Sequence, residues 1–310
     1  MSAPALPSPL AVVCHDAGAT NLILPWLDPQ RQRVAAVVQG PAERLWHERF
    51  GARGRVDSLE QALDGAAMLL SGTGWASDLE HRARVLARAR GLRSVAVVDH
   101  WVNYEARFER DGRRELPDAV WVTDDEALAL ARDRFPTCDV RLQPNLYLQA
   151  QLAQVAPCPD PRRCQDLLVV LEPVRSEWGR GRAGEFQALD HLVSQAGRLG
   201  LRQPLRLRLR PHPSDAPGKY DEWMQAQSAH DVRLDDAPTL AQAIGRVAWV
   251  AGCESMALVV ALKAGRRVVC TLPPWAPACR LPHQGLIHLR ELAPAPVGPA
   301  EAAPQPASSV

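Results

Sequence analysis

The chain has 310 residues, enough for two domains of ordinary size. Hydrophobic residues make up 46% of it and charged residues 23%, a composition typical of a globular protein and not of a disordered one. The net charge of +1 excludes a general electrostatic attraction to nucleic acid or to an anionic membrane. We therefore expect no nucleic-acid partner.

The first residues and the cysteines bear on where the chain works. The start, MSAPALPSPLAVV, has no basic stretch followed by a long apolar core, and no apolar run approaches the roughly 20 residues that span a bilayer. The seven cysteines are scattered, and the nearest pair, Cys158 and Cys164, matches neither a CxxC redox motif nor a zinc knuckle. We expect a cytoplasmic enzyme with reduced thiols and no transmembrane segment, and peripheral association with a membrane stays open.

The first half alternates apolar, β-branched runs with amphipathic stretches, the pattern of βα units around a parallel sheet. The expected strands are 11–14, 34–38, 66–70, 94–98 and 119–122. The expected helices are 22–27, 42–50, 58–63, 77–90 and 126–134. The strands are continuous apolar runs, which is typical of strands buried on both faces.

The stretch 155–164, VAPCPDPRRC, interrupts this pattern and is the best linker candidate, because prolines oppose helix continuation. Beyond it the expected strands are 167–171, 205–209, 247–251 and 267–271, and the expected helices are 184–199, 220–227 and 255–264. The predicted fold class is α/β, with two Rossmann-like domains, 1–154 and 155–293, and an Ala- and Pro-rich tail, 294–310, expected to be disordered. Open α/β sheets bind ligands at the carboxyl ends of their strands, so we expect a cleft between the two domains.

The sequence RPHPSD follows the strand expected at 205–209. A proline on each side of His212 stiffens the backbone and holds the imidazole, which donates to a phosphate or a carboxylate. Arg210 and Lys219 supply positive charge nearby, and Ser214 belongs to the same candidate set. The plainer alternative is a proline-rich turn with a surface histidine.

The sequence GCESMA follows the strand expected at 247–251 and opens an apolar helix. The backbone N–H groups and the dipole of a helix N-terminus favour a phosphate, the Ser255 hydroxyl adds a donor, and Glu254 accepts from ribose hydroxyls. A tight turn before a capped helix explains Gly252 and Ser255 but not Glu254. With the RPHPSD loop, this turn predicts a site for a nucleotide phosphate in the second half.

The sequence HDAG follows the first expected strand. Asp16 is the candidate general base that deprotonates an acceptor hydroxyl during sugar transfer with inversion, and His15 is the alternative base. A simpler alternative is that Asp16 only caps the helix that follows.

The sequence DHWVNY follows the strand expected at 94–98. The candidate acceptor-binding residues are Asp99, His100, Trp101, Asn103 and Tyr104. Aromatic faces stack on the C–H groups of a sugar, and polar neighbours bind its hydroxyls. The alternative is that the two aromatic side chains pack inside the domain.

The pair RPHPSD…KY and GCESMAL resembles the donor half of glycosyltransferases of the GT-B fold. The His-Pro pair ahead of a Ser-bearing helix is similar to bacterial sialyltransferases and other transferases of CMP-activated acidic sugars. Related arrangements occur in polyglycerol-phosphate transferases and UDP-sugar 2-epimerases. The resemblance covers the second half by motif and the first half by architecture, and it implies that His212 and Ser255 contact the nucleotide phosphate and that Glu254 lies on or near the ribose. Where the sialyltransferases often carry an acidic pair before glycine, this chain has HDAG.

The first hypothesis is an inverting glycosyltransferase of surface-polysaccharide or glycoconjugate assembly. It moves a sugar from a nucleotide-sugar donor, with a CMP-linked acidic sugar favoured, to a glycan or lipid-linked acceptor. No DxD-like motif stands directly after a strand, so we expect neither a metal nor a cofactor beyond the nucleotide-sugar substrate. The alternatives are a UDP-sugar 2-epimerase of the same fold and a nucleotide-sugar-binding protein without catalysis.

Overall fold

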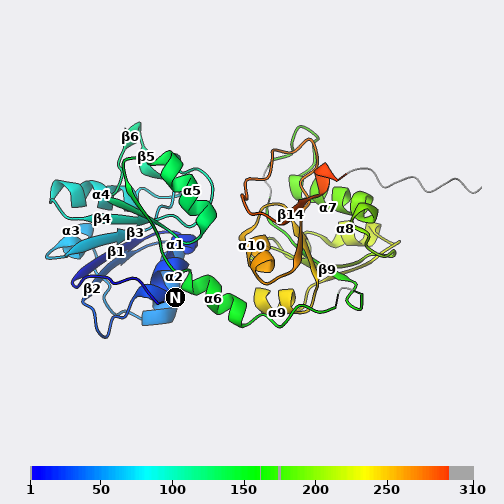
Figure 1. Cartoon of the computed structure of the whole chain (residues 1–310), viewed down its shortest axis with the longest axis horizontal. Coiled ribbons are helices and arrows are strands. Elements are labelled where there is room, and N and C mark those ends of the chain that lie inside the picture. The colour runs from blue at the N-terminus through cyan, green and yellow to red at the C-terminus, as the bar shows by residue number, and fades with distance from the viewer. Residues whose placement is uncertain (1, 161, 174–175, 293–310) are drawn as a thin grey trace, which may run out of the picture. The chain divides into compact units, whose positions relative to one another are not determined.

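The structure, a computed structural model, describes residues 2–160, 162–173 and 176–292 and divides into two compact units (Figure 1). The first unit holds the described residues up to Ala153 together with residues 280–283. The second unit holds residues from Gln154 to Cys279 and those from Gln284 onward. The predicted second domain runs without a break over 155–293, whereas residues 280–283 group with the first unit. The predicted tail, 294–310, lies outside the described residues.

The first unit is built on a parallel sheet of six strands in the order β2-β1-β3-β4-β7-β8. Its strands are β1 (Leu10–Cys14), β2 (Val34–Val38), β3 (Met68–Ser71), β4 (Ser94–Val97), β7 (Ala119–Val122) and β8 (Asp139–Leu142). Its helices are α1 (Ala17–Ile23), α2 (Pro41–Phe50), α3 (Leu59–Leu63), α4 (Leu79–Ala89), α5 (Asp125–Arg134) and α6 (Leu146–Ala153). A small hairpin, β5 (Glu109–Arg110) and β6 (Arg113–Arg114), stands apart from the sheet.

Alternate residues of the strands pack in two separate apolar layers, because successive side chains of a strand point to opposite faces of the sheet. Leu10, Val12 and Cys14 of β1 pack in the layer that contains α1 and α2. Ala11 and Val13 pack in the other layer, with α3 and α4. Both faces of the sheet are therefore covered, which explains why its inner strands are apolar throughout.

Helix α1 differs from its prediction. The sequence predicts a helix over 22–27, whereas α1 begins at Ala17 and is followed by a 3₁₀ turn, Leu24–Trp26. The start is set by Asp16, whose side chain accepts a hydrogen bond from the N–H of Ala19. Pro25 lies within the 3₁₀ turn, where an α-helix does not continue.

The second unit also has a parallel sheet of six strands, in the order β11-β10-β9-β12-β13-β14. Its strands are β9 (Asp166–Val170), β10 (Arg206–Arg210), β11 (Asp231–Leu234), β12 (Trp249–Gly252), β13 (Arg267–Cys270) and β14 (Leu286–His288). Its helices are α7 (Gly184–Gln195), α8 (Asp221–Ala226), α9 (Leu240–Gly245) and α10 (Met256–Lys263). Counted within the unit, this is the strand order 3-2-1-4-5-6 of the Rossmann fold, and the predicted α/β class with two Rossmann-like domains is confirmed.

Each sheet has one point where the direction of strand addition reverses, and ligands of open α/β sheets bind outside the strand ends at such a point. In the first unit it lies between β1 and β3, and in the second between β9 and β12. The loops after these four strands are therefore the places to search for a site. No helix within the described residues is long and apolar enough to cross a membrane.

Candidate functional site

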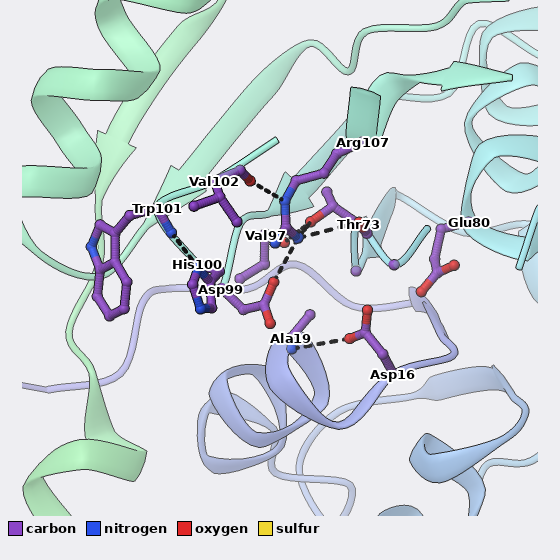
Figure 2. A network of polar contacts seen from close by, with 12 residues as sticks. Asp16, Ala19, Thr73, Glu80, Val97, Asp99, His100, Trp101, Val102 and Arg107 are labelled. Carbon is purple, nitrogen blue, oxygen red and sulfur yellow. Dashed lines mark hydrogen bonds and ion pairs between the residues drawn. The ribbon is translucent and has the colours of Figure 1, made fainter. Parts of the chain in front are cut away.

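In the first unit, polar side chains meet at the carboxyl ends of β1, β3 and β4 (Figure 2). Asp16 comes directly after β1, Thr73 follows β3, and Asp99 follows β4. The group therefore stands at the point where this sheet reverses direction, on loops that three neighbouring strands hold in place.

Arg107 organises this group. Its guanidinium donates to Asp99 Oδ1 at 2.7 Å and to Thr73 Oγ1 at 3.1 Å, and its Nε donates to the carbonyl of Val102 at 3.1 Å (Figure 2). The hydroxyl of Thr73 in turn donates to the carbonyl of Val97 at 3.0 Å. Since Arg107 is 8% exposed, this charge-assisted network holds Asp99 in one position.

Two glycines leave the room that the carboxylates need. Asp99 Oδ2 lies 1.6 Å from where a Cβ atom on Gly18 would be, and Asp16 Oδ2 lies 2.5 Å from the corresponding point on Gly74. An alanine at either position would overlap a carboxylate. Gly18 of the HDAG sequence is thus needed for the close approach of Asp99 to the first turn of α1.

A third carboxylate, Glu80 of α4, lies beside this group (Figure 2). Its side chain is fully buried, and its Oε1 accepts a hydrogen bond from the backbone N–H of His15 at 2.8 Å. Its Oε2 is buried without a hydrogen-bond partner among the described residues. The buried guanidinium of Arg84, one turn along α4, supplies an opposite charge.

Two of these carboxyl groups, Asp16 and Glu80, have raised pKa values. Burial raises the pKa of Asp16, and the negative charge of Asp99 raises it further. Burial raises the pKa of Glu80 to about 7, against the hydrogen bond from His15, and the charge of Asp16 adds to the rise. Glu80 therefore titrates near neutral pH, as the acids and bases of enzyme sites commonly do.

His15, the predicted alternative base, lies against the backbone after β2. Its Nε2 is 2.7 Å from where a Cβ atom on Gly40 would be, and its buried Nδ1 has no hydrogen-bond partner in the part of the chain that is described. Its backbone N–H positions Glu80, as described above. Asp16, which also caps α1, is the better placed of the two predicted bases.

The predicted acceptor-binding residues do not form one surface. Asp99 belongs to the polar group, and His100 accepts at Nδ1 from the N–H of Trp101 at 3.0 Å. Trp101 is 7% exposed and donates from Nε1 to the Asp124 carboxylate at 3.0 Å. Tyr104 is 4% exposed and stacks on Phe135. The two aromatic rings therefore pack inside the first unit, as in the alternative interpretation.

Asn103, the last of the predicted acceptor residues, has a backbone function. Its φ of 59° is in the left-handed region, where Asn is tolerated better than most residues. Its carbonyl accepts from the N–H of Arg107 at 3.1 Å, so this turn carries the chain from Asp99 to its ion-pair partner.

In the second unit the RPHPSD sequence forms a loop around Asp215. Its carboxylate accepts from the N–H of His212 at 2.9 Å and from the hydroxyl of Tyr220 at 3.0 Å, and it pairs with Lys219 at 2.7 Å. His212 is exposed, and its Nδ1 accepts from the N–H of Ser214 at 3.2 Å and lies 2.7 Å from the Ser214 hydroxyl. A neutral imidazole held in this way carries its proton on Nε2, where it can donate to a ligand.

The two predicted cations of this loop are engaged within the unit. Arg210 pairs with the buried carboxylate of Asp235 and donates to the carbonyl of Ala237 at 2.9 Å. Lys219 pairs with Glu185 as well as Asp215, at 2.7 Å in each case. Arg210 and Lys219 therefore hold the loop together, and His212 is the exposed donor.

The turn before α10 stands at the reversal point of the second sheet. Ser255 is the N-cap of α10, and its Oγ accepts from the N–H of Ala257 at 3.2 Å. The N–H of Glu254 donates to Glu172 Oε1 at 2.5 Å, from the loop after β9. One N–H group expected to face a phosphate is thus bonded to a carboxylate, at the end of the helix where anions are favoured.

Sequence reasoning missed Glu80 and assigned no individual role to Glu172 or Arg107. A signal for Glu80 exists, because Glu80 and Arg84 are four residues apart on the same stripe of α4 as the buried Leu79 and Ala83. An acid and a base on an apolar stripe indicate a buried ion pair or a site. Glu172 follows a strand directly, as the other site residues do.

No protein-family model matches the chain, and no curated protein is similar to it in sequence. Solved structures do share its fold. UDP-GlcNAc 2-epimerase from Methanocaldococcus jannaschii gives a TM-score of 0.56 at 8% identity, over 84% of this chain and 83% of that one. The Neisseria meningitidis UDP-GlcNAc 2-epimerase bound to UDP-GlcNAc gives 0.54 at 9% identity, over 88% and 84%. MnaA from S. aureus with UDP gives 0.54 at 12% identity, over 84% and 78%. These likenesses establish a GT-B-like fold of two Rossmann-like domains.

Proposed function

We propose that this chain is an enzyme that performs acid–base chemistry on the sugar of a UDP-sugar, with inversion at C2 as the reaction. The observation that carries the proposal is the group of three carboxyl groups, Asp16, Glu80 and Asp99, at the reversal point of the first sheet. The fold shared with UDP-GlcNAc 2-epimerases supports the same reaction class.

Inversion at C2 breaks one C–H bond and forms another on the opposite face of the ring. C2 adjoins no carbonyl carbon, so the electron pair of the broken C–H bond forms a C1=C2 double bond while the C1–O bond to UDP breaks. A proton then adds to the opposite face of C2, and UDP or water adds to C1. The site must therefore accept a proton from C2 and return a proton to C2 at the same pH, whether UDP or water adds to C1. The raised pKa values of Asp16 and Glu80 suit this requirement, and Glu80, with a pKa of about 7, is protonated in part of the molecules at neutral pH. Asp16, partly exposed, is the proposed base, and the buried Glu80 is the proposed proton reservoir behind it.

In the second unit we propose that the nucleotide binds at the loops after β10 and β12. His212 donates from Nε2 to a phosphate oxygen, because its Nδ1 is occupied by Ser214. The Ser255 hydroxyl and the N-terminal end of α10 add donors, and Glu254 remains the proposed ribose contact.

Glycosyl transfer is the second candidate. The position of Asp16 directly after β1, with a raised pKa, also suits a base that deprotonates an acceptor hydroxyl. The structures named above specify UDP or UDP-GlcNAc, and they do not support the CMP-linked donor favoured from the sequence. A transferase needs an acceptor for turnover, and an epimerase does not.

Product analysis separates these candidates. We expect the wild-type chain, given UDP-N-acetylglucosamine without an acceptor, to form the C2 epimer, either still linked to UDP or released with free UDP, as followed by proton NMR. Asp16→Asn should abolish the product, whereas Asp133→Asn, on the exposed side of α5, should not. Turnover only after addition of a glycan acceptor would replace the epimerase proposal with the transferase.

A further inference from the structure

Three side chains that bind soft metals lie together in the second unit, and none of them has a role in the proposed function. Cys270, Cys279 and His288 each offer one ligand atom, and these atoms all lie within 4.8 Å of one another. Cys270 is buried and the other two are half-buried. Their spacing in the sequence, Cys-x8-Cys-x8-His, is too wide for a zinc knuckle, so only the fold reveals the cluster.

The sheet itself places two of the three ligands. Cys270 is the last residue of β13, and in the parallel pairing it stands opposite His288, the last residue of β14. Paired residues of neighbouring strands direct their side chains to the same face of a sheet, so the thiol and the imidazole are neighbours by register. Such placement on strands holds ligands more precisely than placement on loops.

The third ligand comes from the connection 271–285, which is fixed at several points. The guanidinium of Arg290 donates to the carbonyls of Pro274, Ala276 and Pro277 at 2.7–3.1 Å. The thiol of Cys270 donates to the carbonyl of Cys253 at 3.1 Å, and Cys279 Sγ lies 4.0 Å from the same oxygen. Both sulfur atoms therefore lie over the turn that precedes α10.

The donor set suits Zn²⁺. Zinc is bound at about 2.3 Å by thiolate sulfur and about 2.0–2.1 Å by imidazole nitrogen, which places tetrahedral ligand atoms roughly 3.5–3.8 Å apart. The ligand atoms here, all within 4.8 Å of one another, reach that geometry by small side-chain movements. Two thiolates neutralise the charge of the ion, which makes its burial beside apolar neighbours such as Leu272 and Ala276 acceptable. Hard cations such as Mg²⁺ and Ca²⁺ prefer oxygen ligands instead.

We propose that Cys270, Cys279 and His288 bind one zinc ion through two thiolates and one imidazole, leaving a fourth position for water. The ion links the connection 271–285 to the ends of β13 and β14, next to the turn that carries Glu254 and Ser255. The zinc proposal does not depend on the reaction proposed above. Epimerase activity in a chain that binds no zinc would leave the reaction proposal standing and overturn the zinc proposal. Zinc binding by a chain without epimerase activity would do the reverse.

The test is metal titration of the full chain, freed of metal by a chelator and kept under a thiol-free reductant. We expect about one Zn²⁺ per chain, a rise in melting temperature on addition of Zn²⁺, and thiolate-to-metal charge-transfer absorption with Co²⁺ as the probe. Cys279→Ser and His288→Ala should weaken Zn²⁺ binding by more than the roughly 10- to 100-fold that loss of an outer-shell partner costs.

The controls are Cys158→Ser, an exposed thiol, and His230→Ala, and both should bind zinc as the wild type does. Circular dichroism verifies the fold of each variant, and if His288→Ala does not fold, the milder Cys279→Ser decides. The proposal fails if the reduced wild type binds no Zn²⁺, or if the two site variants bind it unchanged. A disulfide between Cys270 and Cys279 that persists under reductant and excludes zinc would also overturn it.

Discussion

The carboxylate of Asp99 occupies the space that a side chain at Gly18 would need, with Oδ2 only 1.6 Å from the position of that missing Cβ atom. The two residues are far apart in the sequence, one at the start of α1 and the other after β4. The missing side chain at Gly18 leaves the space that Asp99 occupies, and the charge of Asp99 raises the pKa of Asp16. Gly18 therefore affects the electrostatics of the site, because it leaves room for the charge of Asp99.

Gly18→Ala should displace Asp99 and break its ion pair with Arg107. We expect a loss of about 1–3 kcal/mol in the free energy of unfolding, as for overpacking of a close-packed interior, and loss of turnover. Chemical denaturation and the epimer assay measure the two effects. Gly197→Ala is the control, because a Cβ atom at Gly197 meets nothing within 4 Å, and this variant should keep both properties. Full activity in Gly18→Ala would show that the position of Asp99 does not matter.

Glu80 should make the stability of the protein fall as the pH rises. Burial raises the pKa of Glu80 from its ordinary value of 4.5 to about 7, so the folded state binds the proton more tightly than the unfolded state. The contribution of protonated Glu80 to the free energy of unfolding is therefore present below about pH 4.5. It is lost as the pH rises from 4.5 to 7, and the loss is at most about 3 kcal/mol.

Glu80→Gln removes this titration, so urea denaturation from pH 4.5 to 8 should show the variant gaining stability relative to the wild type as the pH rises. Glu60→Gln, an exposed position on α3, should leave the wild-type pH dependence intact. Parallel curves for the wild type and Glu80→Gln would mean that Glu80 is ionised across this range.

The apolar strands of this fold, including the edge strand β2, are predictable from sequence, and its polar edge strands are not. The strands β8 and β11 both have the sequence DVRL, both lie at a sheet edge, and both have mostly exposed or half-buried residues. An edge strand does not need the continuous apolar run by which the inner strands were found, and charged residues there oppose edge-to-edge pairing. The sequence pattern therefore does not reveal β8 or β11.

The sequence predicts those residues of the candidate site that follow the ends of strands. Asp16, Asp99 and His212 follow predicted strands, and the sheet brings the first two together. The partners of these residues are set by long-range contacts that no local pattern contains. Examples are Glu80, bonded to the N–H of a residue 65 positions away, and Arg210, paired with an acid 25 positions away.

Phosphate binding should depend on His212. His212→Ala should lower the affinity for UDP about 10-fold, which is the loss of one hydrogen bond to a charged group. The rise in melting temperature with increasing UDP concentration measures the affinity of wild type and variant. His47→Ala removes an exposed histidine of α2 and should behave as wild type. An unchanged UDP response in His212→Ala would exclude the RPHPSD loop as the phosphate site.

We expect Glu172 to weaken the binding of a nucleotide. Its carboxylate occupies the N–H of Glu254, and its charge opposes a phosphate near α10. Glu172→Gln should therefore bind UDP roughly 3- to 10-fold more tightly, as expected for removal of one partly screened charge. Isothermal titration calorimetry measures this change, with Glu222→Gln, exposed on α8, as the control. Weaker UDP binding in Glu172→Gln would mean that Glu172 helps to form the site.

The exchange of the C2 hydrogen with solvent tests the central claim most directly. The chain is incubated with UDP-N-acetylglucosamine in deuterium oxide, without an acceptor, and the sugar is followed by NMR and mass spectrometry. We predict that deuterium enters at C2 as the epimer forms, and that Asp16→Asn slows this exchange by about 100-fold or more, as for loss of a general base. A wild-type protein that binds UDP but exchanges no hydrogen at C2 and forms no epimer would contradict the account.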